Sequence, residues 1–291
     1  MAMNSQSLSK EQVLIVGCGD IGQRLAQQLP QDTYEITGLR RNPPENLPFL
    51  RYQVCDVTNA AQLNEVLKQN FAVIVISMTP SERSDAGYER AYVQTCQNLV
   101  DALQAQSLKP RLLIFVSSSA VYGQMDGSWV DETSPTEPEG FSGKRLLEAE
   151  VVIQNSGFAN TIVRFSGIYG PNRNRLIEQV RQGKASASPH ITNRIHADDC
   201  AGSLAHLIEL NRKGQDVQPI YLATDNLPVA MIDVVTWLAQ QMGIADFLSD
   251  DATNERGNKR CSNQRLLDSG FVFRYPTFKE GYLAVLADPK A

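Results

Sequence analysis

The residues best suited to chemistry are a run of serines after an apolar segment and a lysine at the start of a helical stretch. Ser117, Ser118 and Ser119 follow RLLIFV, and Lys144 lies in SGKRLLEAE. Hydroxyls at the carboxyl end of a buried strand can donate hydrogen bonds to a carbonyl or alkoxide oxygen. Serines that end a strand can also simply satisfy the backbone of a turn, and Lys144 can be a solvated partner of Glu148. Carbonyl or alkoxide chemistry is therefore the first hypothesis, with these structural roles as the alternatives.

A glycine-rich loop near the N-terminus has the pattern of a phosphate-binding turn. In VLIVGCGDIGQRLAQQL, three glycines separate an apolar run from a stretch with helical spacing. Glycines permit a tight turn and a close backbone approach, so that a pyrophosphate can rest on the amides that open the helix. A purely structural turn is the alternative. The predicted cofactor contacts in this loop are Gly17, Cys18, Gly19, Asp20, Ile21 and Gly22, although Cys18 can also be a small residue that fills space.

The end of the second predicted strand, which contains YEITGL, favours NADP over NAD. NAD sites usually carry an Asp or Glu there, about 20 residues beyond the loop, to bind the adenosine ribose hydroxyls. This chain has Gly38, Leu39, Arg40 and Arg41 instead. A guanidinium suits the 2'-phosphate of NADP through paired, charge-assisted hydrogen bonds, so Arg40 is the predicted contact. NAD is the alternative cofactor if both arginines are ordinary solvated loop residues.

Two further pairs of residues are predicted to line the same cleft. Asp56 and Val57 lie at the end of the third predicted strand, in RYQVCDV, and would meet the adenine edge. The alternative is that Asp56 only caps the next turn. Ser77 and Met78 stand at the end of the apolar run FAVIVIS. Because ligands of parallel sheets bind at the carboxyl ends of the strands, both pairs are expected beside the glycine loop.

The elements that would position these residues alternate along the first half of the chain. Short apolar runs such as VLIV, YEITGL, FAVIVIS, RLLIFV and NTIVRF are separated by helical patterns, among them residues 88–105 and 142–154. Such alternation predicts an α/β fold, in which a parallel sheet is covered by helices on both faces. Fully apolar runs are typical of strands that are buried on both faces.

After Gly170 this alternation stops. Residues 171–194 are rich in Arg, Asn, Ser and Gly and are predicted to form an irregular insertion. A helix over 198–210, the strand PIYLAT and a helix over 229–242 follow, and the polar stretch DDATNERGNKRCSNQ precedes an aromatic tail. The predicted organisation is a nucleotide-binding domain over residues 1–170, with about 195–225 included, and a smaller, discontinuous substrate-binding lobe over 171–291.

Composition narrows the class of partner. The 291 residues are 42% hydrophobic and 20% charged, which predicts a globular chain with a substantial core. A net charge of -5 provides no basic footprint for nucleic acid, and no apolar run is long enough to span a bilayer. Five scattered cysteines form no CxxC pair, so neither a disulfide framework nor a zinc site is predicted, and a reducing cytosol is expected. A small-molecule partner is favoured.

The motifs in order resemble those of a known superfamily. VGCGDIG, CDVTN, SSSAVYG, DETSPTEP, SGKRLLEAE, VRFSGIYGP, RIHADDCAG and YLATDN are together similar to the extended short-chain dehydrogenases/reductases, the NAD(P)-dependent epimerase/dehydratase group. The resemblance runs from Val13 to about Tyr282 and is nearest to the atypical members labelled nucleoside-diphosphate-sugar epimerases. It implies a Rossmann-type doubly wound sheet with a smaller C-terminal substrate lobe. It also implies oxidation–reduction or epimerisation of a sugar nucleotide or a related hydroxy/carbonyl compound.

The resemblance assigns roles to particular positions and exposes one departure. The superfamily combines a Ser or Thr with a Tyr-x-x-x-Lys pair, which fall on Ser118 (or Ser119) and on Lys144. Lys144 would hold the nicotinamide ribose and lower the pKa of the tyrosine, but the tyrosine position is Gly140. The resemblance further implies that Ser166, Gly167 and Ile168, after the run NTIVRF, border the nicotinamide; the alternative is that they only form a turn into Tyr169. Phe165, the last residue of that run, is a further predicted cofactor contact.

Without a tyrosine at position 140, the source of the proton is open. Another hydroxyl can act, or a substrate group or water can supply the proton, or the chain can be an NADP-binding sensor with weak or lost catalysis. The candidate hydroxyls are those of Ser118, Ser119, Tyr122 and Tyr169, although Tyr122 can also be a packed, hydrogen-bonded ring.

The substrate side is less defined by the sequence. Arginines and a lysine around the insertion suit a diphosphate, or are ordinary surface charges: Arg173, Arg175, Arg181, Lys184 and Arg194. No metal site is predicted, because His190, His196 and His206 build no recognisable ligand set. The resemblance also implies a homodimer, formed through the helices over 88–105 and 142–154.

Overall fold

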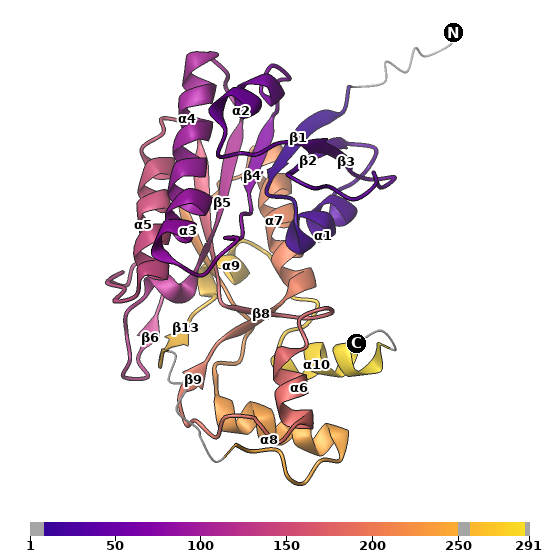
Figure 1. The fold of residues 1–291 in the computed structure, drawn as a ribbon, viewed down its shortest axis with the longest axis vertical. Helices are drawn as coiled ribbons and strands as arrows, with labels where there is room; N and C mark the ends of the chain where they lie inside the picture. The colour runs from indigo at the N-terminus through magenta and orange to yellow at the C-terminus, as the bar shows by residue number, and fades with distance from the viewer. Residues whose placement is uncertain (1–8, 250–256, 289–291) are drawn as a thin grey trace.

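The computed structural model describes residues 9–249 and 257–288. Its centre is a parallel sheet of seven strands in the order β11-β7-β5-β4-β1-β2-β3 (Figure 1). The strands of this sheet are β1 (Glu11–Val16), β2 (Tyr34–Arg40), β3 (Arg51–Val54), β4 (Val73–Ile76), β5 (Leu112–Ser118), β7 (Asn160–Phe165) and β11 (Ile220–Ala223). The α/β fold expected from the alternating pattern is confirmed.

Burial on both faces explains why the central strands are apolar throughout. Every residue of β4 is buried, and β5 is buried from Leu112 to Phe115. The register of β5 with β7 pairs Ser118 with Phe165. The serine turn and the residues after β7 therefore leave the sheet at the same edge, which is where the carboxyl ends of the other strands also lie.

Two layers of helices cover the sheet (Figure 1). On one face, Leu25 of α1 and Leu204 of α7 share a core with the strands, and on the other Leu99 of α4 and Ile153 of α5 do so. The covering helices are α1 (Asp20–Gln28), α7 (Ala197–Arg212) and the short α9 (Gln264–Asp268), and, opposite, α2 (Ala60–Val66), α3 (Asp85–Tyr88), α4 (Thr95–Ala105) and α5 (Phe141–Gln154). The helix expected over 88–105 begins earlier, at Asp85, and includes a π-helical segment, η1 (Glu89–Gln94), between α3 and α4.

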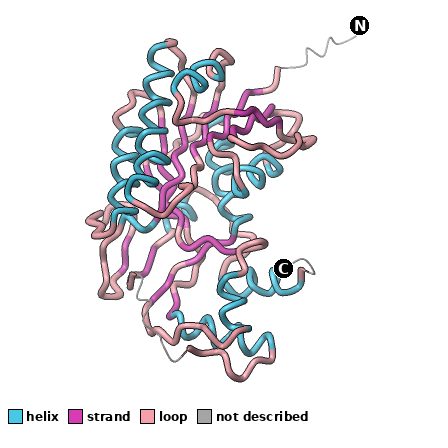
Figure 2. Tube along the Cα trace, viewed as in Figure 1, coloured by secondary structure: helices cyan, strands magenta, loops and turns pink. Residues whose placement is uncertain are grey.

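A smaller group of helices lies beyond the carboxyl edge of the sheet (Figures 1 and 2). We call α6 (Arg175–Arg181), α8 (Met231–Met242) and α10 (Phe278–Ala287) the C-terminal lobe. The lobe has its own apolar cluster, which includes Val180, Leu238 and Tyr282. Pairs of short strands accompany it: β8 (Gly167–Tyr169) with β10 (Arg194–His196), β9 (Ile191–Thr192) with β12 (Val229–Ala230), and β6 (Trp129–Val130) with β13 (Arg260–Cys261).

Several boundaries differ from those expected. Residues 171–194 are not irregular throughout, because they contain α6 and β9. The charged residues of α6 mask its apolar positions Ile177 and Val180, which are buried in the lobe. The helix expected from Val229 begins at Met231, since Val229 and Ala230 form β12. Part of the polar stretch before the tail, residues 250–256, lies outside the described residues, and Arg260–Cys261 within it form β13.

No helix in the described ranges combines the length and the apolar character that a bilayer-spanning segment needs.

Candidate functional site

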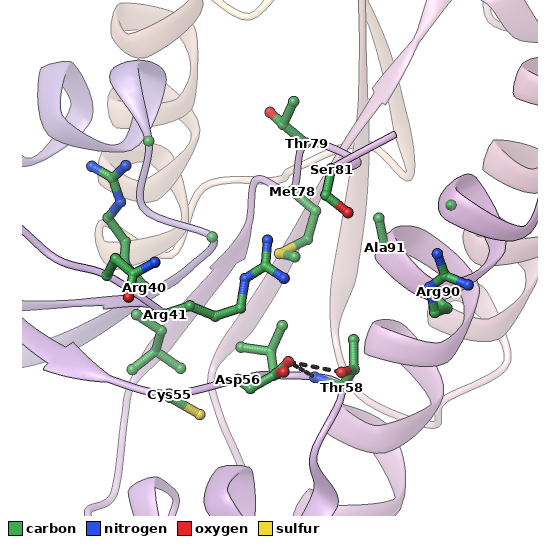
Figure 3. Close-up of a pocket in the computed structure, with 16 residues that line it drawn as sticks. Arg40, Arg41, Cys55, Asp56, Thr58, Met78, Thr79, Ser81, Arg90 and Ala91 are labelled. Carbon is green, nitrogen blue, oxygen red and sulfur yellow. Dashed lines mark hydrogen bonds between the residues drawn. The ribbon is translucent and has the colours of Figure 1, made fainter. Parts of the chain in front are cut away.

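A cavity with a volume of about 330 Å³ lies at the carboxyl ends of β1, β2, β3 and β4 (Figure 3). We call it the nucleotide cavity. Six of the predicted cofactor contacts line it, namely Gly17, Gly19, Arg40, Asp56, Val57 and Met78. The structure thus brings together residues from four separate strand ends.

The glycine loop has the backbone that a close ligand approach requires. Gly17 adopts a φ of +78°, and a Cβ placed there would lie 2.5 Å from Sδ of Met78. Gly19 precedes α1 without any side-chain cap on the helix, and a Cβ on Gly19 would meet no atom within 4 Å. Uncapped amides beside open space are what a pyrophosphate needs, so this loop fits the phosphate groups of a dinucleotide.

Arginines approach the nucleotide cavity from two sides (Figure 3). On one side, Arg40 ends β2 and Arg41 follows it, while on the other Arg90 comes from η1 and pairs with Glu82. Among the described lining residues, Asp56 is the only carboxylate. Its Oδ1 accepts hydrogen bonds from the amide and hydroxyl of Thr58, at 3.1 and 2.7 Å, so this carboxylate is engaged in its own turn.

Other predicted cofactor contacts lie outside the lining. The side chain of Cys18 is fully buried beneath the loop, where burial raises the pKa of its thiol to about 12. Ile21 is buried against the sheet, and Gly22 allows Ile15 to approach α1 closely. The carboxylate of Asp20 pairs with Arg24 and Arg173. Ser77 contributes an amide bonded to the carbonyl of Val16, and Phe165 is buried in the core, whereas Ile168 lines a second cavity.

The predicted reaction end is the turn that follows β5. Ser118 is half-buried, and its Oγ accepts a hydrogen bond of 3.2 Å from the amide of Ala120 at the start of η2 (Ser119–Val121). Lys144 is exposed on the first turn of α5, on the side of Asp85. Arg145, and to a smaller extent Lys144, hold the pKa of Asp85 below its usual value.

Gly140 precedes α5 with an extended backbone, and a Cβ there would meet only Oγ of Ser142, at 3.9 Å. The space that a tyrosine would need at its Cβ is therefore open. The neighbouring ring, that of Phe141, packs edge-on against Tyr88 at a centroid distance of 5.4 Å.

A buried ion pair holds the serine turn, α5 and β7 together. Arg164 donates to both carboxylate oxygens of Glu150, at 3.0 and 2.6 Å, and to the hydroxyl of Tyr122 at 2.9 Å. Ser117 donates to the same carboxylate at 2.5 Å. Each of these side chains is at least nine-tenths buried. The network fixes the turn that carries Ser118 relative to the helix that carries Lys144.

The two tyrosines considered as proton donors are enclosed. Burial raises the pKa of Tyr122 to about 12, and its hydroxyl is occupied by Arg164. Tyr169 is only 4% exposed, packs against Tyr282 and Gly281, has a pKa raised by burial, and lines the second cavity described below. Burial thus makes both phenols weaker acids than an exposed tyrosine.

A second cavity of about 290 Å³ opens between β8 and the C-terminal lobe, and a third of about 170 Å³ shares several of its residues. Three of the predicted substrate-side arginines line the second cavity: Arg173, Arg175 and Arg194. Arg181 pairs with Glu178 on α6 instead. The ion pair between Arg173 and Asp20 joins the second cavity to the first turn of α1.

No group of three potential metal ligands occurs in the described ranges. Burial lowers the pKa of His196 to about 4, and its Nδ1 accepts a hydrogen bond from the amide of Asp198. His196 is thus a neutral N-cap of α7.

Gly87, Arg90 and Ala91 line the nucleotide cavity from α3 and η1 and were not predicted from the sequence. A π-helical segment shifts the register of a helix, and no residue pattern in this stretch marks it. Glu150, the partner of Arg164, was not predicted from the sequence either. A signal was available there, because an arginine inside the apolar run NTIVRF requires a buried counter-charge.

The parallel sheet order and the glycine loop at the end of β1 define a Rossmann-type α/β protein. The chain belongs to the NAD dependent epimerase/dehydratase family, whose model matches residues 13–219. A protein from Methylobacillus flagellatus that carries the same family description is 38% identical, with 96% of this chain and 98% of that chain covered and a TM-score of 0.81.

More distant solved structures share the fold. UDP-glucuronic acid 4-epimerase from Bacillus cereus, solved with NAD, is 18% identical over 94% of this chain and 95% of its own, with a TM-score of 0.78. A dTDP-glucose 4,6-dehydratase from Streptomyces venezuelae, also with NAD, is 20% identical over 94% and 95%, with a TM-score of 0.78. Among curated proteins, none matches the chain.

Proposed function

We propose that this chain is an NADP-dependent oxidoreductase or epimerase that acts on a sugar nucleotide or a related hydroxy/carbonyl compound. The observation that carries the proposal is the nucleotide cavity, in which an open glycine loop faces a pair of arginines. Among the described residues that line this cavity, the one carboxylate, that of Asp56, is already hydrogen-bonded to Thr58. An anionic ligand with several phosphates matches this combination.

Different residues would bind different parts of the cofactor and of the substrate. The loop from Gly17 to Gly22 would hold the pyrophosphate, and Arg40 would bind the 2'-phosphate. Asp56, Val57 and Met78 would enclose the adenosine. When bound, the nicotinamide cofactor would donate or accept a hydride. Ser118 would donate a hydrogen bond to the substrate oxygen, and Lys144 would hold the nicotinamide ribose.

The substrate class rests on the second cavity and on the family. The Bacillus cereus neighbour is an enzyme of UDP-glucuronic acid, and another neighbour of this fold, MoeE5, was solved with UDP-glucose and NAD. Here three arginines line the cavity next to the predicted nicotinamide end. We propose that they receive the phosphates of a nucleotide sugar.

Binding of NADPH and NADH to the purified chain is the direct test, followed by assays with carbonyl compounds and sugar nucleotides. We expect NADPH to bind at micromolar concentration and more tightly than NADH. Failure of both cofactors to bind at saturating concentrations would refute the proposal.

A second candidate function is favoured by Gly140. A chain that keeps the nucleotide cavity but lacks the family's tyrosine can act as an NADP-responsive sensor or interaction protein. NADPH binding that changes no carbonyl compound, but alters assembly or partner binding, would support this alternative.

Three further expectations complete the proposal. The division into a nucleotide-binding domain (1–170 and about 195–225) and a substrate lobe (171–291) is supported by the separate apolar cluster of the lobe. A homodimer through α3, η1, α4 and α5 stays a prediction that sedimentation analysis can test. A cytosolic location agrees with the five cysteines, which are all free and buried.

A further inference from the structure

Arg194 is the buried member of the three arginines that line the second cavity. It is 6% exposed, whereas Arg173 and Arg175, before and at the start of α6, are exposed. Burying a guanidinium costs free energy that is recovered only through suitable partners. The contacts of Arg194 therefore indicate what this wall of the cavity can receive.

The guanidinium of Arg194 is held at the cavity wall by neutral groups. Its Nη1 donates a hydrogen bond of 2.6 Å to Oγ1 of Thr192, and its Nη2 lies 3.3 Å from Sδ of Met231. Thr192 and Met231 line the second cavity themselves, as does Tyr282, whose hydroxyl also neighbours this guanidinium. Since a thioether is a weak acceptor, these partners fix the position of the guanidinium without neutralising its charge.

The other deeply buried arginine in this region has a different environment. Arg164 donates to both carboxylate oxygens of Glu150, so its charge is balanced inside the fold. In the described ranges, Arg194 makes no such ion pair. The carboxyl of Asp225 is close enough for the charge of Arg194 to lower its pKa, but burial dominates and raises that pKa to about 7. A carboxyl with this pKa is partly protonated at neutral pH and balances the guanidinium incompletely.

The place of Arg194 relates it to the carbon that would react. In the register of β8 with β10, Arg194 stands opposite Gly167. Gly167 and Ile168 line the same cavity and are predicted to border the nicotinamide. Gly167 comes two residues after Phe165, the sheet partner of Ser118, which is at most about 7 Å along an extended chain. A ligand group on Arg194 would thus lie close to the proposed reaction end.

The charge of this wall favours a carboxylate over a diphosphate. One guanidinium balances one negative charge, whereas a diphosphate would bring at least two charges among the neutral partners of Arg194. The planar guanidinium also matches the two oxygens of a carboxylate through parallel hydrogen bonds. The phosphates of a nucleotide sugar then fall to Arg173 and Arg175, which stand in contact with solvent.

We propose that Arg194 binds a carboxylate of the substrate, within a few bonds of the carbon that gives or takes the hydride. The substrate is then an acid, either the uronic acid unit of a nucleotide sugar or a free hydroxy or oxo acid. Arg194 selects this acid and positions its reacting carbon beside Gly167 and Ile168. This inference rests on the proposed function, because it specifies the substrate of the same site.

Matched pairs of ligands test the carboxylate in the wild-type chain. UDP-glucuronic acid differs from UDP-glucose only by a carboxylate in place of a hydroxymethyl group, and glucuronic acid differs from glucose in the same way. Titration calorimetry of the full chain is run for both pairs, with and without NADP. We expect the acid to bind about tenfold or more tightly than its neutral partner. Equal affinities within both pairs, or no binding of either acid, would overturn the proposal.

The same titrations distinguish the two sources of the carboxylate. Much tighter binding of UDP-glucuronic acid than of glucuronic acid would identify a nucleotide sugar. Comparable binding of the two acids would identify a free acid.

Substitutions then assign the preference to Arg194. Arg194→Gln keeps a donor for Thr192 but removes the charge, so the ratio of acid to neutral affinity should fall to about one. Arg175→Gln should weaken UDP-glucuronic acid and UDP-glucose alike and leave their ratio unchanged. Arg181→Gln is the control with unchanged binding, because Arg181 pairs with Glu178 away from the cavity lining.

A second variant covers the case in which Arg194→Gln shows no cooperative thermal transition. Arg194→Lys keeps the charge but cannot offer the paired hydrogen bonds, so the ratio should fall about threefold or more. A ratio that stays at the wild-type value in a folded variant of Arg194 would overturn the proposal.

Failure of this inference and failure of the proposed function are distinguishable. A chain that binds no NADPH refutes the proposed function, whatever the ligand ratio is. Normal NADPH binding together with equal affinities for acid and neutral ligands refutes only the carboxylate role of Arg194.

Discussion

Gly17 and Gly19 of the phosphate loop contribute differently to stability and to cofactor binding, and single substitutions should separate the two contributions. Gly17→Ala places a Cβ 2.5 Å from Met78 in a left-handed backbone, whereas Gly19→Ala places one in open space. We expect Gly17→Ala to lower both the thermal midpoint and NADPH affinity, with about 1–2 kcal/mol lost to the backbone conformation alone. Gly19→Ala should weaken NADPH binding with the thermal midpoint unchanged. Equal thermal midpoints for the two variants would contradict this assignment.

Arg40 should determine the choice between the two cofactors. Hydrogen bonds to a charged partner contribute about 1.5–3 kcal/mol, so Arg40→Ala should weaken NADPH binding about tenfold or more and leave NADH binding nearly unchanged. Titration calorimetry with both cofactors measures this ratio. Arg51→Ala is a matched control, because Arg51 pairs with Glu35 in an exposed position. An equal loss for both cofactors would show that Arg40 does not read the 2'-phosphate.

Restoring the family's tyrosine tests whether the position is still useful. The Cβ of Gly140→Tyr meets only one atom within 4 Å, so the variant should fold. If another group already donates the proton, we expect no gain in kcat, measured by NADPH oxidation beside a Gly140→Ala control. A tenfold gain would show instead that the site lacks a donor.

Residue patterns could predict the glycine loop and the strand-end residues, because their chemistry depends on local order along the chain. They also allowed Cys18 to be a small buried residue, but they could not predict that Lys259 contacts Tyr122 after the serine turn. Lys259 lies in a polar stretch that resembles a surface connection. Its environment is created by contacts with Tyr122 and Asn193, which are far away in the sequence.

At the scale of elements, the buried pair of Arg164 and Glu150 should stabilise the joint between β7, β5 and α5. Glu150→Gln leaves the guanidinium without a counter-charge, which typically costs about 3–5 kcal/mol in the free energy of unfolding. Urea unfolding of both single variants and of Arg164→Met/Glu150→Met measures the coupling. The double variant should lose less than the sum of the single losses, and strict additivity would argue against a coupled pair.

The strands of the sheet were predictable because burial on both faces demands continuous apolar runs. The elements of the lobe were less so. In α6 the apolar positions are separated by Arg, Glu and Gln, and β9 and β12 are two-residue strands held mainly by pairing with each other. The π-helical turn of η1 arises from tertiary packing, which sequence periodicity does not encode.

At the scale of the whole molecule, Asp225 should make stability depend on pH. It follows β11, its amide donates to the carbonyl of Arg194, and its Oδ2 has no hydrogen-bond partner among the described residues. Burial raises the pKa of Asp225 from 3.8 to about 7. Between these values the folded chain holds a proton that the unfolded chain releases. The stabilising contribution is therefore complete below the unfolded pKa and is lost as the pH rises towards 7.

Asp225→Asn removes this titration and keeps an oxygen for the amide of Leu227, which Oδ1 accepts at 3.0 Å. We expect the variant to have a higher thermal midpoint than the wild type at about pH 8, and a smaller difference at about pH 5. Asp216→Asn, at an exposed position, is the control. A difference that does not change with pH would mean that Asp225 is ionised throughout.

The described residues that line the nucleotide cavity all fall between Gly17 and Ala91, whereas Ser118 and Lys144 follow later in the chain. During synthesis, these lining residues are therefore all translated before the first residue of β5, Leu112. The residues proposed for the reaction end are translated after them. A growing chain would thus carry the whole lining for the dinucleotide long before it could carry out the reaction.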